Sequence, residues 1–531
     1  MRKTSMPKVI PALTALALLL TGCAGGEDSG AASTITVAVG EPDHLTPGRS
    51  TVGLEGIRAL FAPLVKADEH GGLTYVQARS VESEDSKNWT IHLRSGWKFH
   101  NGEAVTAQSY ADAWNKTAYG PNAWAANGQL ANIEGYDALN PAKGKPKTDK
   151  LSGVKVVNET TLKVTLANPD SQFPLQLTSN QVGFYPLPKA AYEDPAAFDR
   201  KPAGNGPYKL DGEWEKNKGA TASAYGDYQG QKPLTSHLDF RSYTDLATAY
   251  TDAYTDAQAG TVDVLQAPVN KYSQTKTDFA GRVYSYQAPS LEFISLPLYD
   301  ERYQKPGLRK AISMAIDRDA VNNTMYGGLY EPATSLTPPA EVGAKTDVCD
   351  ECTFDPKEAR KELAAAGGWS GPMVITYPGG LGFDELYKAV ANQIRQNLRI
   401  DNVTARPTAD FAEFSEKAMA KKINGPYHGH WGALYPSMQN TLRSIFTKAG
   451  DCYACSYYSE PEVDSLLRRA DASTVTEESE KLYNKAQERI LEDFPVVPLF
   501  YGTYVYVTTE RISNVVIGPA DLELDRLRVI E

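Results

Sequence analysis

The stretch GLRKAISMAIDRDAVNNTMYGGLYEPATSLTPP, residues 307–339, is the part of the chain that best reveals its fold. Its first half places apolar side chains at the spacing of one helix face. These side chains are Leu308, Ala311, Ile312, Ala315 and Ile316. Asp317 or Asp319 can cap a second short helix, and Gly327-Gly328 can end it. We therefore predict two short helices, the first of them buried along one face.

The chain before this stretch shows the same mixture of strands and helices. Residues 34–39, TITVAV, alternate as a strand does, and a loop with proline and glycine follows. Residues 54–65, LEGIRALFAPLV, have helical periodicity. Residues 89–117 predict a strand, a turn at Asn101-Gly102 and a helix that Thr106 would cap. Periodicity alone therefore predicts a large α/β protein.

Several segments, in the same order along the chain, resemble those of the family 5 extracellular solute-binding proteins. That group contains oligopeptide, dipeptide, nickel and some oligosaccharide receptors of ABC importers. The segments are LRSGWKFHNGEAVTA (93–107) with Trp114, GNGPYKL (204–210), AGTVDVLQAPV (259–269), residues 307–339, FDPKEARKELAAAG (354–367), YYSEPEVDSLLRRAD (457–471) and EDFPVVPLFYGTYVYV (492–507). The resemblance covers nearly the whole chain after its first 33 residues.

The resemblance implies a bilobed, class II periplasmic-binding-protein-like α/β fold with an additional domain. By that analogy lobe I is discontinuous and consists of residues 34–65, 188–288 and 504–531. The additional domain would run over residues 66–187, and lobe II over residues 289–503. A chain of this length is expected to divide into two or three packed units in any case.

The N-terminus has the features of an export signal. Arg2, Lys3 and Lys8 precede an uncharged run from Val9 to Leu20 that is too short to cross a hydrocarbon core of about 30 Å. Leu20-Thr21-Gly22-Cys23 resembles a bacterial lipobox, in which the cysteine is acylated after cleavage; an ordinary signal peptide with a chance cysteine is the alternative. We expect residues 1–22 to be removed, Cys23 to anchor the protein to the outer face of the membrane, and residues 23–33 to be a flexible tether.

Charge excludes one class of partner. The formal net charge is −11, and loss of the three basic residues of the signal would make it −14. Nucleic acids and anionic headgroups attract Lys and Arg, so we expect no nucleic acid partner and no contact with the membrane beyond the lipid. No apolar run after Cys23 approaches 18 residues, so the sequence predicts no later membrane span.

Four cysteines remain once Cys23 is assigned to the lipid: Cys349, Cys352, Cys452 and Cys455, in two CxxC pairs. In the cytosol two such pairs would suggest a zinc site. Thiols outside the membrane are normally oxidised, so we expect disulfides, with zinc or free redox-active thiols as alternatives. The spacing does not decide whether each bridge is local.

The sequence lacks the usual signs of an enzyme. It contains no GxSxG, HExxH, GxGxxG or P-loop motif. His428 and His430 alternate as on a strand, which would put both on one face within reach of one ligand or metal. Two partly exposed histidines without a function are the competing interpretation. We expect neither an enzyme nor a cofactor.

The family resemblance also suggests a binding site. It places Trp431 and Tyr435 on cavity residues, and Trp124, Arg49 and Thr51 on loops that face the cleft. Peptide-binding members carry an aspartate just before that tyrosine, which pairs with the peptide's ammonium group, whereas this chain has Leu434. A buried ammonium without a counter-charge costs several kcal/mol. Either another carboxylate replaces the aspartate, with Glu55, Asp300 and Asp384 as candidates, or the ligand has no free amine.

We therefore expect a monomeric binding protein that closes its lobes on an oligopeptide or peptide-like solute and delivers it to the permease of an ABC importer. The high aromatic content, with 30 tyrosines and 7 tryptophans, suits peptide backbones and sugar faces alike. An oligosaccharide, a nickel chelate or a haem-like compound is the alternative ligand. A thiol or zinc lipoprotein that uses the CxxC pairs is a more distant alternative.

Overall fold

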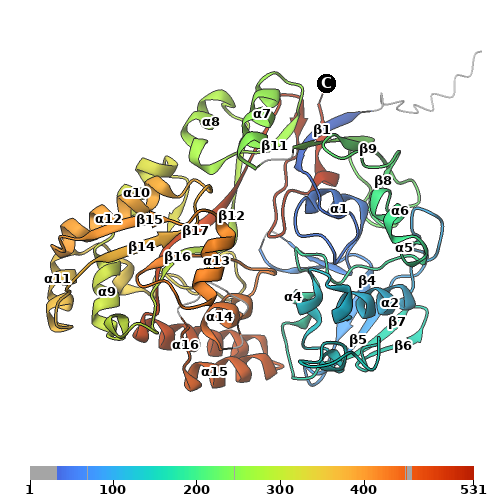
Figure 1. Cartoon of the computed structure of the whole chain (residues 1–531). Helices are drawn as coiled ribbons and strands as arrows, with labels where there is room; N and C mark the ends of the chain where they lie inside the picture. Colours follow the sequence, from blue (N-terminus) through green and yellow to red (C-terminus); the bar gives the residue numbers. More distant parts are fainter. Residues whose placement is uncertain (1–32, 69, 244–245, 449, 451–456, 531) are drawn as a thin grey trace, which may run out of the picture.

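Two bodies lie side by side and are joined by two long strands in this computed structural model (Figure 1). The structure describes residues 33–530 except residues 69, 244–245, 449 and 451–456. The expected signal, Cys23, almost all of the tether, Cys452 and Cys455 lie outside the described residues. We call the body that contains β1 lobe I and the body that contains β14 lobe II.

One sheet of eleven strands runs through both lobes, in the order β15-β14-β16-β12-β17-β11-β1-β10-β9-β8, with β13 paired to β17. In lobe I, β1 pairs in parallel with β10 and β11, and β9 and β8 extend the sheet in antiparallel pairs. The elements of lobe I are β1 (Thr34–Gly40), α1 (Leu54–Leu60), β2 (Val65–Ala67), β3 (Leu73–Tyr75), α5 (Ala190–Glu193), α6 (Pro195–Arg200), β8 (Tyr208–Leu210), β9 (Gly219–Ala224), β10 (His237–Tyr243), α7 (Leu246–Gln258), β11 (Val264–Gln266), α8 (Tyr272–Asp278), β18 (Ile512–Ser513) and β19 (Arg528–Val529).

A separate four-stranded antiparallel sheet, β4-β5-β7-β6, packs beneath lobe I. Its elements are β4 (Ala78–Glu82), β5 (Asn88–Leu93), α2 (Ala107–Ala118), α3 (Tyr136–Leu139), β6 (Val154–Asn158), β7 (Thr161–Thr165) and α4 (Phe173–Gln176). Thr106 caps α2 in a capping box with Ser109, as the sequence predicts. The side chains of this sheet and of lobe I form one hydrophobic core, in which Trp114 is fully buried.

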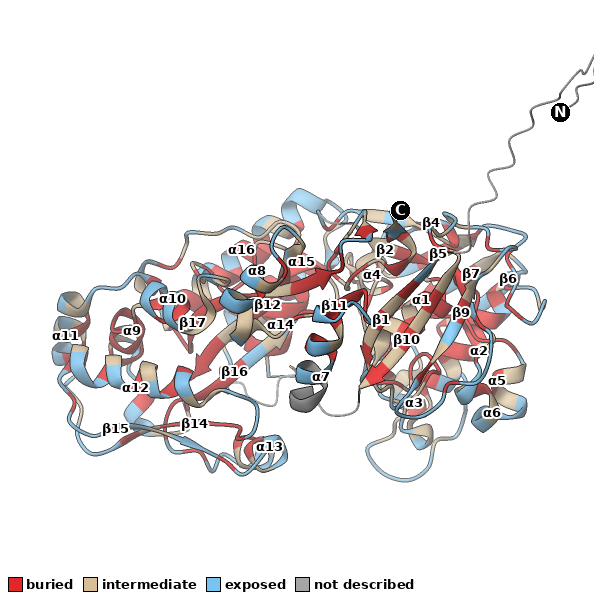
Figure 2. Ribbon diagram, turned by 90° about the horizontal axis from the view of Figure 1, so that it is seen from above, coloured by how far each residue is buried: buried red, intermediate tan, exposed pale blue. Residues whose placement is uncertain are grey.

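Lobe II has its own core, built on the parallel pair β14 and β15 and on β16. Figure 2 shows buried positions concentrated on the strands and on the inner faces of the helices. The elements of lobe II are α9 (Pro306–Met314), α10 (Arg318–Tyr326), β13 (Glu331–Pro332), α11 (Pro356–Ala365), β14 (Met373–Tyr377), α12 (Asp384–Leu398), β15 (Val403–Pro407), α13 (Phe411–Met419), β16 (Tyr427–Gly432), α14 (Met438–Phe446), α15 (Pro461–Ala472) and α16 (Thr476–Asp493).

The connection between the lobes is the antiparallel pair β12 (Val283–Ser295) and β17 (Val496–Thr508). Their register is interrupted between Gln287 and Leu291, opposite Thr503 and Tyr501. An irregular ladder bends more readily than a regular one. The two strands can therefore act as a hinge at this point.

The stretch 307–339 forms the two predicted helices, with two differences in detail. Asp317, and not Asp319, caps the second helix, since its side chain accepts a hydrogen bond from the Ala320 N–H. The first helix ends at Met314, so Ala315 and Ile316 are buried in the link that follows it. Gly327 ends α10 with φ 59°, the left-handed conformation that glycine adopts easily.

The expected helix over residues 54–65 is shorter than its apolar pattern suggests, because α1 ends at Leu60. Pro63 disfavours helical geometry at the residue before it, and the Ala62 N–H instead donates to the buried Asn205 side chain (3.0 Å). Gly204 and Gly206 lie against the end of α1. A Cβ atom on Gly204 would come within 1.9 Å of the Leu60 carbonyl oxygen. The glycines of the GNGPYKL segment thus allow a contact that fixes the position of α1.

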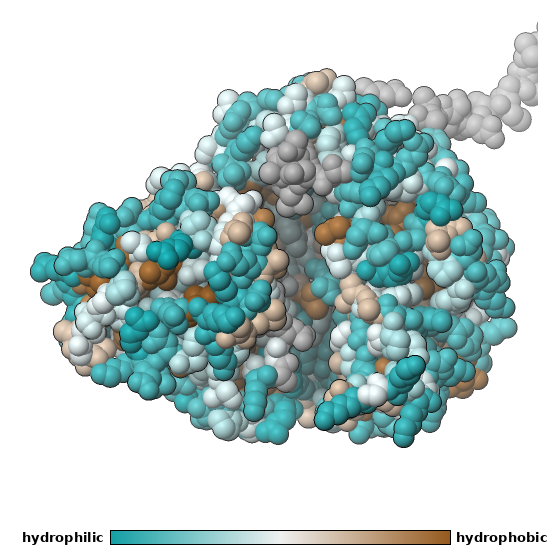
Figure 3. All heavy atoms as spheres, in the orientation of Figure 1, coloured by the Kyte–Doolittle hydropathy of each residue, from teal (hydrophilic) through white to brown (hydrophobic). Residues whose placement is uncertain are grey.

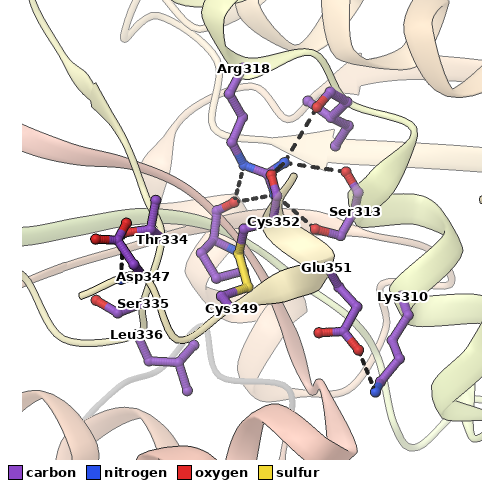
Figure 4. Close-up of a disulfide and its surroundings, with 12 residues drawn as sticks. Lys310, Ser313, Arg318, Thr334, Ser335, Leu336, Asp347, Cys349, Glu351 and Cys352 are labelled. Atoms are coloured by element: carbon purple, nitrogen blue, oxygen red, sulfur yellow. Dashed lines mark hydrogen bonds and ion pairs between the residues drawn. A yellow bond between two sulfur atoms is a disulfide. The ribbon is translucent and has the colours of Figure 1, made fainter. Parts of the chain in front are cut away.

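Cys349 and Cys352 form a local disulfide (Figure 4). These two thiols are therefore not available as ligands of a zinc ion. The buried guanidinium of Arg318 lies beside this disulfide and donates to the carbonyl oxygens of Cys352 (2.7 Å) and Pro498 (2.6 Å). This side chain joins the disulfide loop, α10 and β17.

Candidate ligand-binding cleft

A furrow separates the two lobes on the face seen in Figure 3, and two cavities lie between the lobes. The large cavity, of about 520 Å³, is lined by the end of β1, residues 51–55, β11 and the cleft end of β16. The small cavity, of about 120 Å³, lies between α1, residues 178–180 and residues 434–436. Both cavities are lined by Glu55, Arg58, Asn180, Leu434, Asp521, Leu522 and Leu524. The large cavity falls in the size range of pockets for small ligands.

Four of the predicted site residues line these cavities. Thr51 and His430 line the large cavity, Tyr435 lines the small one, and Leu434 lines both. The Thr51 hydroxyl donates to Asp43 (2.7 Å). One predicted residue of lobe I and three of lobe II therefore lie at the cleft.

The other four predicted residues do not line either cavity. Arg49 lies 3.6 Å from the Asp199 carboxylate and lines a different surface hollow. Trp124 packs against the lobe I core, next to Gly48. The Trp431 indole N–H donates to Asn440 Oδ1 (3.0 Å), which also accepts from the Leu434 N–H (3.0 Å). Asn440 thus connects Trp431 to the loop that carries Leu434.

His428 and His430 both lie on β16, as predicted, but their environments differ. His428 is 5% exposed and its Nδ1 forms a hydrogen bond with the Tyr387 hydroxyl (2.9 Å). Burial lowers the pKa of His428 to about 4, so its ring is neutral near pH 7. His430 instead reaches the cleft, where its Nδ1 lies 2.6 Å from Glu292 Oε1. Both rings lie on the same face of β16. The core of lobe II covers this face at His428 but not at His430.

A metal site is not formed by these histidines. Within the described part of the chain, no three His, Cys, Asp or Glu side chains converge in a way that could hold a metal ion. Glu292 is engaged by His430, and this interaction keeps the pKa of Glu292 low although burial alone would raise it. The pair is therefore a polar feature of the cleft wall.

Of the three carboxylates considered as substitutes for the missing aspartate, only Glu55 lines the cavities. Asp300 is paired with Arg302, and Asp384 accepts from the Tyr377 hydroxyl (3.0 Å); both lie in lobe II outside the two cavities. Asp521 also lines both cavities and forms an ion pair with Arg58. No sequence motif marked Asp521 or Arg58, because 463 residues separate them.

Comparison with known proteins identifies the family. The model described as bacterial extracellular solute-binding proteins, family 5 (middle), matches residues 74–451. The chain belongs to this family. Its members are binding proteins, which confirms the prediction that the chain is not an enzyme.

Curated relatives of this family 5 protein align over most of their length. The periplasmic murein peptide-binding protein MppA of Escherichia coli is 27% identical, over 87% of this chain and 86% of the relative. The periplasmic oligopeptide-binding protein OppA of the same organism is 26% identical, over 84% and 82%. The structure described as the unliganded open form of the murein tripeptide-binding protein MppA has a TM-score of 0.80, with 22% identity, and covers 94% of this chain and 98% of that one. The predicted bilobed fold is confirmed.

The lobes of the family 5 protein also touch directly, at a polar contact that sequence reasoning missed. The Asn180 N–H donates to the Leu434 carbonyl oxygen (2.9 Å), and the Ser437 hydroxyl donates to Gln172 Oε1 (2.8 Å). The Gln439 Nε2 group donates to Asp170 Oδ1 and to Asp471 Oδ1, at 2.8 Å each. The residues joined across the lobes are 254 to 269 positions apart in the chain, so no local pattern marks this contact.

Replacement of Gln439 by alanine is expected to weaken the cross-lobe contact. The Asp170 carboxylate is buried and would lose the hydrogen bond that crosses to it from Gln439, whereas the bond from Gln439 to Asp471 lies within lobe II. Hydrogen bonds to charged groups contribute about 1.5–3 kcal/mol, so we expect the equilibrium to shift toward separated lobes by about 10- to 100-fold. Small-angle X-ray scattering should then give a larger radius of gyration than for the exposed control Gln229→Ala. An unchanged radius in both variants would contradict the prediction.

Proposed function

We propose that this protein captures an oligopeptide or peptide-like solute between its lobes and delivers it to the permease of an ABC importer. The observation that carries the proposal is the pair of cavities between two lobes that a bendable strand pair connects. Ligand contacts to both lobes would favour the closed arrangement. The names of the relatives MppA and OppA, which refer to peptides, support the ligand class.

The geometry of β16 also supports an extended peptide. β14 pairs with β16 only through Thr376 and Tyr427. Beyond that pair, no strand of the described residues lies along β16 on the side away from β12. Extended peptides bind to such strand edges through main-chain hydrogen bonds. The cleft end of this strand lines the large cavity.

Titration calorimetry tests this function. Tri- to pentapeptides with free amino termini should bind with one site per monomer, and Tyr435→Ala should weaken binding, since Tyr435 lines the small cavity. Ser83→Ala, at a half-buried loop position that lines neither cavity, serves as the control. Absence of peptide binding together with tight binding of an oligosaccharide, a nickel chelate or haem would overturn the peptide proposal.

The non-peptide solute remains the second candidate because of Leu434. This apolar side chain lines both cavities where peptide-binding members of the family would be expected to carry an aspartate. A ligand without an amine would not need a carboxylate there. The same calorimetric comparison separates the two candidates.

We also propose the domain limits implied by the family resemblance: lobe I from residues 34–65, 188–288 and 504–531, the additional domain from 66–187, and lobe II from 289–503. The interrupted register of β12 and β17 lies close to the limits at 288 and 503. The separate cores support a division between lobes I and II. The additional domain shares its core with lobe I, so we expect these two to move as one body.

The proposed location is the outer face of the cell membrane, with Cys23 acylated and the protein monomeric. The lipobox-like Leu20–Cys23 segment supports the anchor. None of the helices that the structure describes has the length and apolar character needed to cross a bilayer. In this proposal the lipid on Cys23 attaches the protein to the membrane.

A further inference from the structure

Glu55 occupies an unusual position in the cleft wall. Its side chain extends from α1 and lines both the large and the small cavity. Its Oε2 atom is almost fully buried and has no hydrogen-bond partner among the described residues. A buried carboxylate oxygen without a partner costs free energy. Such a group is tolerated where a ligand provides the missing partner.

The neighbouring charges do not satisfy Glu55. Arg58, one turn further along α1, forms its ion pair with Asp521, which also accepts from the Tyr506 hydroxyl. Lys66, the other cation that lines the small cavity, is paired with Glu523 (3.0 Å). The cations nearest to Glu55 are therefore already engaged by other carboxylates. Among the described residues, Glu55 is the acid of this wall whose Oε2 atom has no hydrogen-bond partner.

We propose that Glu55 binds a positively charged ammonium group of the ligand, so that recognition of an amine comes from lobe I. This inference rests on the proposed peptide function and deepens it. Leu434 faces the same two cavities from lobe II and contributes no charge. The small cavity, at about 120 Å³, has room for a head group, and the large cavity takes the remainder of the ligand. The ligand class is therefore a peptide with a free α-ammonium group.

The titration of Glu55 agrees with this role. Burial and the nearby Asp521 carboxylate raise its pKa, and Arg58 opposes the shift only in part. The groups that face Glu55 are Arg58, Asp521 and Tyr506, and His430 lines the same large cavity. An ammonium ligand pairs with the ionised form of Glu55, so protonation of this carboxyl competes with ligand binding. Affinity for the ligand should accordingly fall as the pH is lowered through the raised pKa.

The test compares Glu55→Gln with the isosteric control Asp384→Asn, whose carboxylate lies outside both cavities. Tri- to pentapeptides and their N-acetylated forms serve as probes in calorimetry. We expect Glu55→Gln and N-acetylation each to reduce affinity by at least about 30-fold, and their effects not to add, because both remove the same pair. The control should bind like the wild type.

Stability of the empty protein gives a second readout. Glu55→Gln replaces a buried carboxylate oxygen that has no hydrogen-bond partner among the described residues, so the melting temperature of the variant should rise slightly above that of the wild type, which a merely structural glutamate would not show. Equal binding of free and acetylated peptides, or unchanged affinity in Glu55→Gln, would overturn the inference and leave the proposed function intact. Failure of the wild type to bind any peptide would overturn both.

Discussion

Arg318→Met is expected to lower the free energy of unfolding by about 3–5 kcal/mol, because it removes the donors for several buried carbonyl groups. Arg318 is 3% exposed. Its guanidinium donates to the Pro498 carbonyl oxygen from two nitrogens, at 2.8 and 2.6 Å, and to the Cys352 carbonyl oxygen at 2.7 Å. Methionine fills a similar volume but satisfies none of these acceptors.

Arg318 is unusual among buried arginines because no carboxylate of the described residues pairs with it. Burial lowers the pKa of Arg318 to about 9, and no acid opposes the shift. Hydrogen bonds to the carbonyl oxygens therefore stabilise the positive charge of the guanidinium. Chemical denaturation of Arg318→Met should show early loss of lobe II, which has a separate core from lobe I. Arg468→Met, at an exposed position of α15, should change stability by less than about 0.5 kcal/mol; equal effects of the two variants would refute the argument.

Gly204→Ala is expected to have an effect of similar size in lobe I, about 3–5 kcal/mol. The added Cβ atom would lie 1.9 Å from the Leu60 carbonyl oxygen, which is backbone and cannot rotate away. The segment cannot move easily, because the Gly204 carbonyl accepts from the His100 N–H (2.7 Å) and the Gly206 N–H donates to the Leu60 carbonyl (2.9 Å). The end of α1 must therefore shift.

Thermal unfolding checks this expectation, with Gly212→Ala as the matched control. A Cβ atom on Gly212 meets no atom within 4 Å, so that variant should melt within about 1 °C of the wild type. Because α1 carries Glu55, Gly204→Ala should also reduce ligand affinity at temperatures where it is still folded. A melting temperature equal to that of the Gly212 variant would contradict the account of the GNGPYKL segment.

The sequence predicts well those features that depend on residues close together in the chain. The strand over residues 34–39, the buried alternation of Trp89, Ile91 and Leu93, and the helices of residues 307–339 follow from periodicity and capping, and the structure has them. The end of α1 was missed, because the apolar pattern continues after Leu60 while the backbone turns away to meet Asn205. At this point the apolar pattern favours a longer helix, whereas the contact with Asn205 favours a turn. The contact determines the structure.

The cleft was only partly predictable, for the same reason. Thr51, Leu434 and Tyr435, proposed from the family resemblance, and His430, proposed from its alternation with His428, line the cavities. The Arg58–Asp521 pair and the bridge from Gln439 to Asp170 join residues that are far apart in sequence and have no motif of their own. Glu55 was one of three candidates until the structure showed which carboxylate faces the cavities.

The position of β17 in the sheet has a consequence for the order in which the molecule assembles. This strand lies between β12 and β11 and so connects the two halves of the sheet, yet it is made of residues 496–508. A nascent chain must therefore leave one edge of the long strand β12 and one edge of the short strand β11 open until nearly all of its length is available, and open strand edges favour aggregation. The many contacts between distant residues also slow folding. We expect folding to be late and slow, and truncation before residue 496 to yield two half-sheets that cannot join.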